Sequence, residues 1–212
     1  MFRTPLLASA AAALAFLFAG AARAAEAPED NLFLQENGAR VSGFSSEFGS
    51  GWEASNLTPS RSDYDEAGAP VRALIWSSAS MAPFPHWAVI RFDRPTWITT
   101  LVFDNHLDEE PDHPGISARE IEVWAGPGET TLTRRASFEL ERNKAGQVVR
   151  IEPVEAGAVK LVVKSNYGHP WYTELGATRA YDDGSRPVAD NATDEGRARN
   201  RRVALRIEGR AP

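Results

Sequence analysis

The chain has 212 residues, of which 42% are hydrophobic and 9% aromatic, a composition typical of a packed globular protein. Its 29 acidic residues outnumber its 23 basic ones, and the formal net charge of −6 disfavours nucleic acid and anionic lipid as partners. The sequence has no cysteine, which excludes disulfides, thiolate metal sites, a thiol nucleophile and a lipoprotein anchor.

Residues 1–24 predict a secretory signal peptide. Arg3 gives a positive start, an apolar run rich in alanine and leucine follows, and Ala22-Arg23-Ala24 forms a small-x-small cleavage site. The rival interpretation is an uncleaved anchor, but the run is weakly hydrophobic for a membrane span. We therefore expect a mature chain that begins at Ala25, opens with an acidic linker at 25–30 and has no transmembrane segment.

Residues 31–182 predict a single β-rich domain. In segment 119–124, Ile121 and Val123 alternate with side chains suited to solvent, which is the pattern of a half-exposed strand. Further strands are predicted at 86–92, 98–103, 147–151 and 159–164. We expect a turn at 93–95 to separate the first two, and a turn near 155–157 to separate the last two. The expected core or near-core residues of the first pair are Trp87, Ile98, Leu101 and Phe103.

Three segments carry a family resemblance: ARVSGFSSEFGSGWEASNLTPS at 39–60, GISAREIEVWAGP at 115–127 and SNYGHPWYTELGATRA at 165–180. In this order they resemble the discoidin-like, or galactose-binding-like, jelly roll. The resemblance implies an all-β fold, namely an antiparallel jelly-roll β-sandwich of eight strands. It also implies a protein that binds a ligand rather than an enzyme.

Catalytic signals are weak in this sequence. The four histidines have no helical metal spacing, and no nucleophile elbow, phosphate loop or dinucleotide turn is present. The acidic run at 104–112 offers carboxylates for acid–base chemistry, as a glycosidase requires, but no partner carboxylate can be assigned. We therefore predict that the protein is not an enzyme and rank a hydrolase last.

Sugar recognition needs flat apolar faces for C–H groups and planar polar groups for hydroxyls. The loop at 166–172 supplies Asn, Tyr, His and Trp, and smaller clusters lie at 83–87 and 105–106. The predicted ligand-binding residues are His86, Asn105, His106, Asn166, Tyr167, His169 and Trp171. The alternative is that the aromatic residues pack inside the protein. We favour a core position for Trp87 and a ligand role for Tyr167 and His169.

The family resemblance also implies a structural calcium ion, held by a turn and by a glutamate on the last strand. Glu174 matches the glutamate, whereas the turn lacks the usual acidic pattern and is followed by Asp63 and Asp65. The expectation is a weak calcium site at these three residues, or no cofactor.

The segment 184–209 resembles the closing part of OmpA-like peptidoglycan-binding domains. The residues in register include Arg197, Asn200, Arg201 and Arg202. The resemblance implies that 183–212 is a C-terminal fragment with a short helix and a last strand, although the family's peptide-binding segment is missing. The other interpretation is a basic, solvated helix over 193–202 that needs no ligand, and we favour it with respect to affinity.

Together these patterns predict a non-catalytic, exported binding module of the bacterial cell envelope. We expect it in the periplasm, at the outer membrane or secreted, with carbohydrate or an envelope glycan as its partner. The alternative is a structural protein that contacts another envelope protein, with its tail on peptidoglycan.

Overall fold

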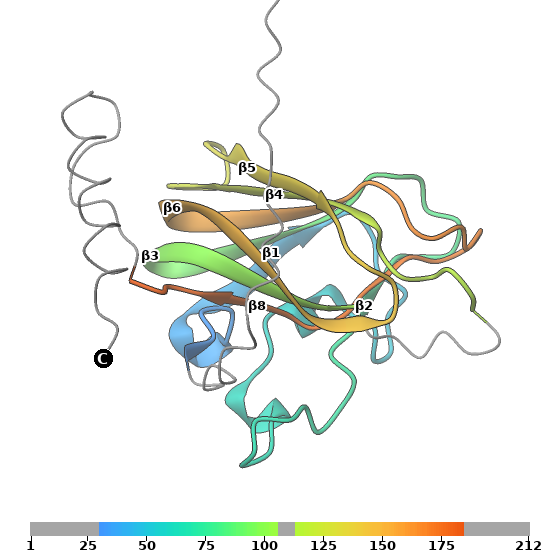
Figure 1. Cartoon of the computed structure of the whole chain (residues 1–212), viewed down its shortest axis with the longest axis horizontal. Helices are drawn as coiled ribbons and strands as arrows, with labels where there is room; N and C mark the ends of the chain where they lie inside the picture. The colour runs from blue at the N-terminus through green and yellow to red at the C-terminus, as the bar shows by residue number, and fades with distance from the viewer. Residues whose placement is uncertain (1–29, 106–112, 185–212) are drawn as a thin grey trace, which may run out of the picture.

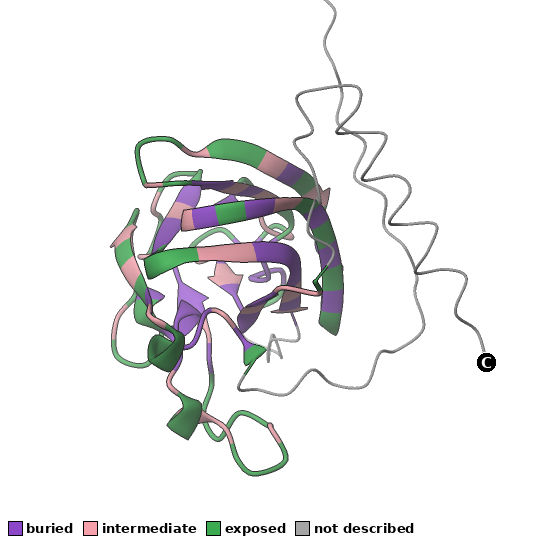
Figure 2. Ribbon diagram, turned by 90° about the vertical axis from the view of Figure 1, so that its left-hand side faces the viewer, coloured by how far each residue is buried: buried purple, intermediate pink, exposed green. Residues whose placement is uncertain are grey.

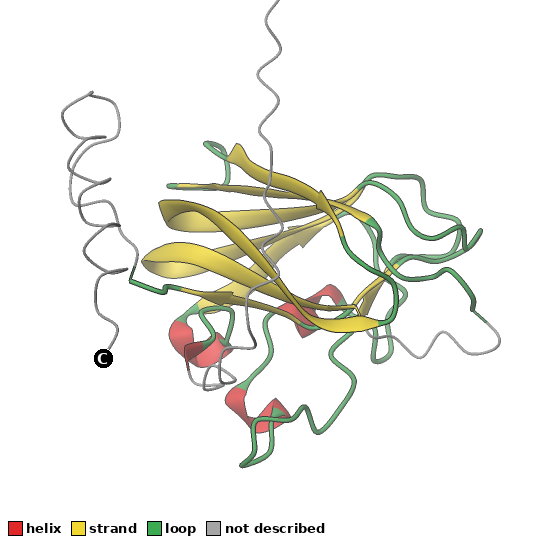
Figure 3. Ribbon diagram, viewed as in Figure 1, coloured by secondary structure: helices red, strands yellow, loops and turns green. Residues whose placement is uncertain are grey.

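The computed structural model describes residues 30–105 and 113–184, and within them nearly all regular structure is antiparallel β-sheet (Figure 3). The eight strands of this part of the chain are β1 (Ala39–Phe44), β2 (Trp76–Ser77), β3 (His86–Asn105), β4 (Glu120–Gly126), β5 (Thr133–Glu139), β6 (Lys144–Val163), β7 (Glu174–Leu175) and β8 (Thr178–Tyr181). Three short 3-10 helices precede β2, namely η2 (Gln35–Asn37), η3 (Ala54–Leu57) and η4 (Arg61–Asp63). The predicted all-β class is confirmed.

Two long strands, β3 and β6, form a bent ribbon that organises the whole fold (Figure 1). The first half of β3 pairs with β1 and with the second half of β6, and β4 and β5 extend this layer. The second half of β3 pairs with β8 and with the first half of β6. The ribbon therefore carries the chain from one layer of the sandwich to the other.

The turns expected at 93–95 and 155–157 are wrong. Each of these stretches lies inside a continuous strand, and the register between β3 and β6 shifts between Arg91 and Thr96. A register irregularity lets paired strands bend sharply without reversing, and it tolerates a proline that cannot donate to the ladder. Pro95 therefore marks a bend between layers, not a hairpin.

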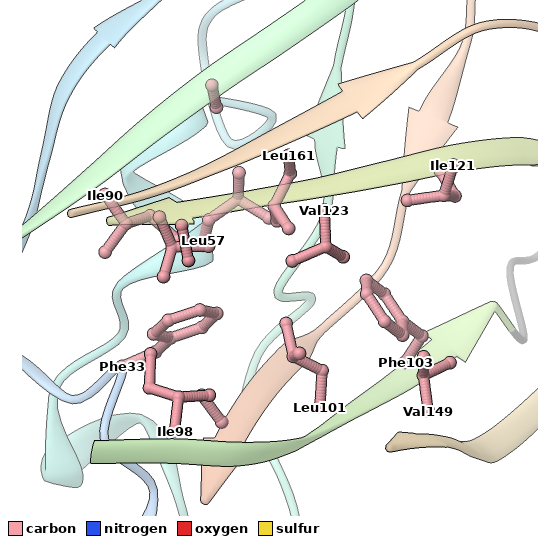
Figure 4. Packing of buried hydrophobic residues seen from close by; sticks show 14 of the residues in the cluster. Phe33, Leu57, Ile90, Ile98, Leu101, Phe103, Ile121, Val123, Val149 and Leu161 are labelled. Carbon is pink, nitrogen blue, oxygen red and sulfur yellow. The ribbon is translucent and has the colours of Figure 1, made fainter. Parts of the chain in front are cut away.

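The core lies between the two halves of the ribbon (Figure 4). Ile121, Val123 and Leu161 point from one layer toward Leu101 and Phe103 of the other, and all five side chains are fully buried. Burial alternates along the strands, which confirms the predicted inward positions in β4 and in the second half of β6 (Figure 2). Burial of each such side chain contributes about 1.5–3 kcal/mol.

The tryptophan at the centre of the core is Trp76, not Trp87. Trp76 is 2% exposed, and its indole N–H donates to the Ser46 carbonyl at 3.0 Å. Trp87 is half-buried on the outer face of β3, where the Lys160 ammonium lies 4.6 Å from its ring centroid. The core position expected for Trp87 is thus wrong, because its neighbours His86 and Ala88 take the inward side.

The start and the end of the described domain lie side by side. Leu32 donates its backbone N–H to the Ala180 carbonyl at 2.8 Å, and Asn31 Oδ1 accepts the Ala180 N–H at 3.1 Å. Figure 1 shows both ends on the left, away from the loops on the right. No helix in the described residues is long and apolar enough to span a membrane.

Candidate functional site

Four loops meet at one end of the sandwich, on the right of Figure 1. They are residues 45–53, 78–85, 113–118 and 165–173, and we call this region the loop end. Backbone hydrogen bonds join Met81 N–H to the Trp171 carbonyl and His169 N–H to the Gly115 carbonyl. Phe48 N–H donates to the Ser77 carbonyl of β2, directly before the loop at 78–85. Hydrogen bonds therefore hold the loop end together as one unit.

Exposed apolar side chains are concentrated at the loop end. Among the described residues, eight large hydrophobic side chains are exposed, and five of them lie on these loops. These five are Phe48 (51% exposed), Trp52 (38%), Met81 (74%), Phe84 (44%) and Trp171 (55%). Contiguous exposed apolar surface on a soluble domain marks an interaction site.

His169 is the centre of a ring cluster beneath this surface. Its side chain is buried and stacks on Tyr172, with ring centroids 5.8 Å apart and an interplanar angle of 20°. Trp171 meets His169 edge-on at 6.0 Å, and the exposed His113 ring lies 5.5 Å away. His169 Nδ1 accepts the Tyr172 backbone N–H at 3.0 Å, so a neutral His169 ring carries its proton on Nε2.

Asn166 organises the loop that carries these rings. Its side-chain amide contacts the carbonyls of His169 and Tyr172 and the Thr173 hydroxyl at 2.9–3.0 Å, while its Oδ1 accepts the Gly168 N–H. With both ends of the amide engaged, Asn166 is placed to hold the loop. Its predicted ligand contact is not tested by this geometry.

Tyr167 lies apart from the ring cluster. Its hydroxyl donates to the Leu140 carbonyl at 2.6 Å, and the Arg119 guanidinium lies 5.6 Å from its ring centroid. The structure therefore brings together two of the predicted residues, His169 and Trp171, and directs Tyr167 toward the end of β5. The ligand role expected for Tyr167 stays a prediction.

His86 and Asn105 are buried, 2% and 0% exposed, so neither offers surface to a ligand as they stand. His86 packs against the Phe84 ring at 4.5 Å, and burial lowers the pKa of its imidazole. Asn105 donates from Nδ2 to the carbonyls of Ala118 and Glu141, and so joins the end of β3 to two neighbouring loops. The fold uses both as interior residues because each lies at an inward position at one end of β3.

The residues expected to hold calcium, Asp63, Asp65 and Glu174, do not form a group of metal-binding side chains among the described residues. Asp63 forms an ion pair with Arg72, whose hydrogen bond is the main cause that lowers the pKa of the Asp63 carboxyl. Asp65 accepts the N–H groups of Ala67 and Ala69 within its own turn. Glu174 lies on β7, paired with β2. No group of three metal-binding side chains occurs among residues 30–105 and 113–184.

Several predictions fall on residues that the structure does not describe. His106 belongs to segment 106–112, and Arg197, Asn200, Arg201 and Arg202 belong to segment 185–212. The signal peptide at 1–24 and most of the linker at 25–30 likewise lie outside the described residues. These remain predictions from the sequence.

Sequence reasoning missed the other members of the loop end, chiefly Phe48, Trp52, Met81 and His113. The signal for Trp52 was available in Gly49-Ser50-Gly51-Trp52, because two glycines around one residue favour a tight turn that projects the next side chain. Met81 and His113 had no comparable signal, since only the folded backbone brings their loops beside residues 169–172.

No family model matches the sequence. Similar solved structures include chitosan-binding module 1 of a chitosanase/glucanase from Paenibacillus sp. IK-5, with 16% identity and a TM-score of 0.53. That match covers 72% of this chain and 98% of that one. CBM32-3, from a family 31 glycoside hydrolase of Clostridium perfringens, has 15% identity and a TM-score of 0.54 over 73% of this chain and 96% of its own.

A third similar structure is the family 32 module of Clostridium perfringens NanJ in complex with galactose. It has 12% identity and a TM-score of 0.50, over 69% of this chain and 96% of the module. At these identities the likeness concerns the fold. The predicted antiparallel jelly-roll β-sandwich is confirmed, since the chain shares its fold with several carbohydrate-binding modules over nearly their whole length.

Proposed function

We propose that this protein is a non-catalytic carbohydrate-binding module whose ligand lies on the loop end. The observation that carries the proposal is the arrangement around Trp171, an exposed indole fixed above a buried histidine in a loop tied to two other loops. A flat, exposed ring held in one place suits the apolar face of a sugar.

The surrounding polar groups suit the hydroxyls of the same sugar. The exposed His113 and the remaining Nε2 atom of His169 offer imidazole nitrogens within one ring cluster. Because Asn166 and Gly115 fix the loop through hydrogen bonds, little side-chain and backbone entropy is lost when the ligand binds.

The ligands of two of the similar structures support this assignment. One is a chitosan-binding module, and another was determined with galactose. We further propose export to the bacterial cell envelope, on the strength of the signal-peptide pattern at 1–24.

The test compares Trp171→Ala with Trp124→Ala on a glycan array and by affinity electrophoresis in polysaccharide gels. Trp124 is a half-buried tryptophan on β4, away from the loop end, and serves as the matched control. We expect Trp171→Ala to lower glycan affinity at least about tenfold, because aromatic contact contributes on the order of 1 kcal/mol beyond apolar burial. Equal affinity in both variants, or retention of no glycan by the wild type, would overturn the proposal.

A further inference from the structure

A second exposed aromatic face lies beside the cluster around Trp171. Phe48 and Trp52 are 51% and 38% exposed, and their rings meet edge-on at 5.8 Å. Phe48 also meets Tyr172 edge-on at 5.3 Å. Rings thus follow one another from Trp171 through His169, Tyr172 and Phe48 to Trp52, with no step between centroids above 6.0 Å.

The turn that presents Trp52 is held tightly. Gly49, Ser50 and Gly51 have positive φ angles of 86°, 43° and 103°, which is costly for the serine. Both carboxylate oxygens of Glu53 accept the Gly51 N–H, and Asn56 donates to the Gly51 carbonyl at 2.8 Å. A strained turn persists only when its surroundings fix it, so the backbone that presents the Trp52 ring is held in one conformation.

The same turn is attached to the loop of Trp171 through β2. The Trp52 carbonyl accepts the Ser77 N–H at 3.1 Å, and Ser78 donates to the Thr173 carbonyl at 2.9 Å. These bonds fix the spacing between the two aromatic faces before any ligand arrives. A ligand that contacts both faces therefore needs no rearrangement of the backbone.

We infer that Phe48 and Trp52 form a second sugar subsite, and that the ligand is an oligosaccharide segment of at least two linked rings rather than a single terminal sugar. One sugar ring covers one indole face, so a ligand that contacts both Trp171 and Trp52 must be a chain of linked rings that spans the three rings between them. This inference rests on the proposed function, because it assigns the size of the ligand at the same loop end.

The experiment measures affinity against chain length. The probes are glucosamine, N-acetylglucosamine and galactose, each as the monosaccharide and as linear oligomers of two to four rings, by array and by titration calorimetry. We expect the wild type to bind oligomers of one of these sugars about tenfold more tightly than the monosaccharide. Trp52→Ala should remove this gain and leave the monosaccharide affinity unchanged, while Trp171→Ala should weaken both.

Two further variants control for folding. Trp52→Tyr keeps an aromatic face and should restore part of the gain, and Phe44→Ala removes an exposed ring at the end of β1 and should change nothing. If oligomers bind no better than monosaccharides, or if Trp52→Ala keeps the oligomer affinity, the second subsite is wrong and the carbohydrate-binding function stands. If no probe binds at any length, both are wrong.

Discussion

The core and the loop end use the same kinds of side chain in opposite ways. In the core, Trp76 and Phe103 are at most 2% exposed and lie on strands β2 and β3, whereas Trp52 and Trp171 are 38% and 55% exposed on loops. Loop backbone is fixed at the loop end by hydrogen bonds and positive-φ residues instead of by a sheet ladder. Exposure, not residue type, therefore separates the aromatic residues that stabilise this fold from those available to a ligand.

The largest expected effect tests the core side of this comparison. Trp76→Ala should lower the free energy of unfolding by about 3–5 kcal/mol, through lost contacts and the cavity that remains. Trp87→Ala should cost only about 1 kcal/mol, since that ring is half-buried and contacts Lys160 on the outer face. Urea unfolding measures both values, and equal losses would contradict the placement of these two tryptophans.

A glycine pair tests how closely the loops pack at the loop end. A Cβ on Gly115 would lie 2.6 Å from the Tyr167 carbonyl oxygen, whereas a Cβ on Gly146 would meet nothing within 4 Å. Both glycines have positive φ, 80° and 66°, so backbone strain should lower the free energy of unfolding of both alanine variants by about 1–2 kcal/mol. Because of the close contact, we expect Gly115→Ala to lower the free energy of unfolding by about 1–2 kcal/mol more than Gly146→Ala does, and to weaken glycan binding. Thermal unfolding gives the difference, and matching losses would show that the loops can separate freely.

Asn166 tests whether the rings need a fixed loop. Asn166→Ala should cost about 1–3 kcal/mol by leaving partners of its amide unsatisfied. Asn166→Asp keeps an oxygen for the Gly168 N–H but cannot donate to the carbonyls of His169 and Tyr172. We expect both variants to lose glycan affinity more than tenfold. Wild-type affinity in Asn166→Asp would show that these donated bonds are unnecessary.

The smallest expected effect is the pH dependence that His86 confers. Burial lowers the pKa of His86 below its ordinary value of 6.5, so the unfolded chain takes up a proton before the folded one does. The stability that the neutral His86 ring contributes is fully present at pH values above the ordinary pKa of histidine. It declines as the pH falls toward the lowered pKa of His86 in the folded chain.

Urea midpoints measured between about pH 7 and 5 test this expectation. His86→Phe should flatten the slope, because the imidazole that titrates is gone. Val71→Gln, at an exposed position that carries no ionisable group, is the control and should keep the wild-type slope. An unchanged slope in His86→Phe would contradict the assignment.

Strand alternation predicted the inner face of β4 and of the second half of β6, because polar and apolar residues there occupy opposite sides. It could not predict the inward side at the start of β3, where both faces carry large or apolar residues and Trp87 faces outward. Nor could it predict the bend at Pro95, since a proline is compatible both with the boundary of a strand and with an irregularity inside one.

The candidate site could be predicted only in part. His169 and Trp171 were found because the polar aromatic loop is continuous in sequence. Phe48 and Trp52 lie more than a hundred residues earlier, and their closeness to Tyr172 depends on the pairing of β2 with β7. Sequence order could not show that the Tyr167 hydroxyl donates to the Leu140 carbonyl, because Leu140 lies 27 residues earlier in the chain.

The meeting of Leu32 with Ala180 fixes how this domain can be tethered. The two ends of the described domain are therefore hydrogen-bonded to each other, and the loop end lies on the opposite side of the sandwich (Figure 1). A further domain joined to either end of the described domain would therefore leave the loop end free to contact a surface. Linking several copies of the domain would raise the apparent affinity for a polymer through effective concentration, without any new contact inside the domain.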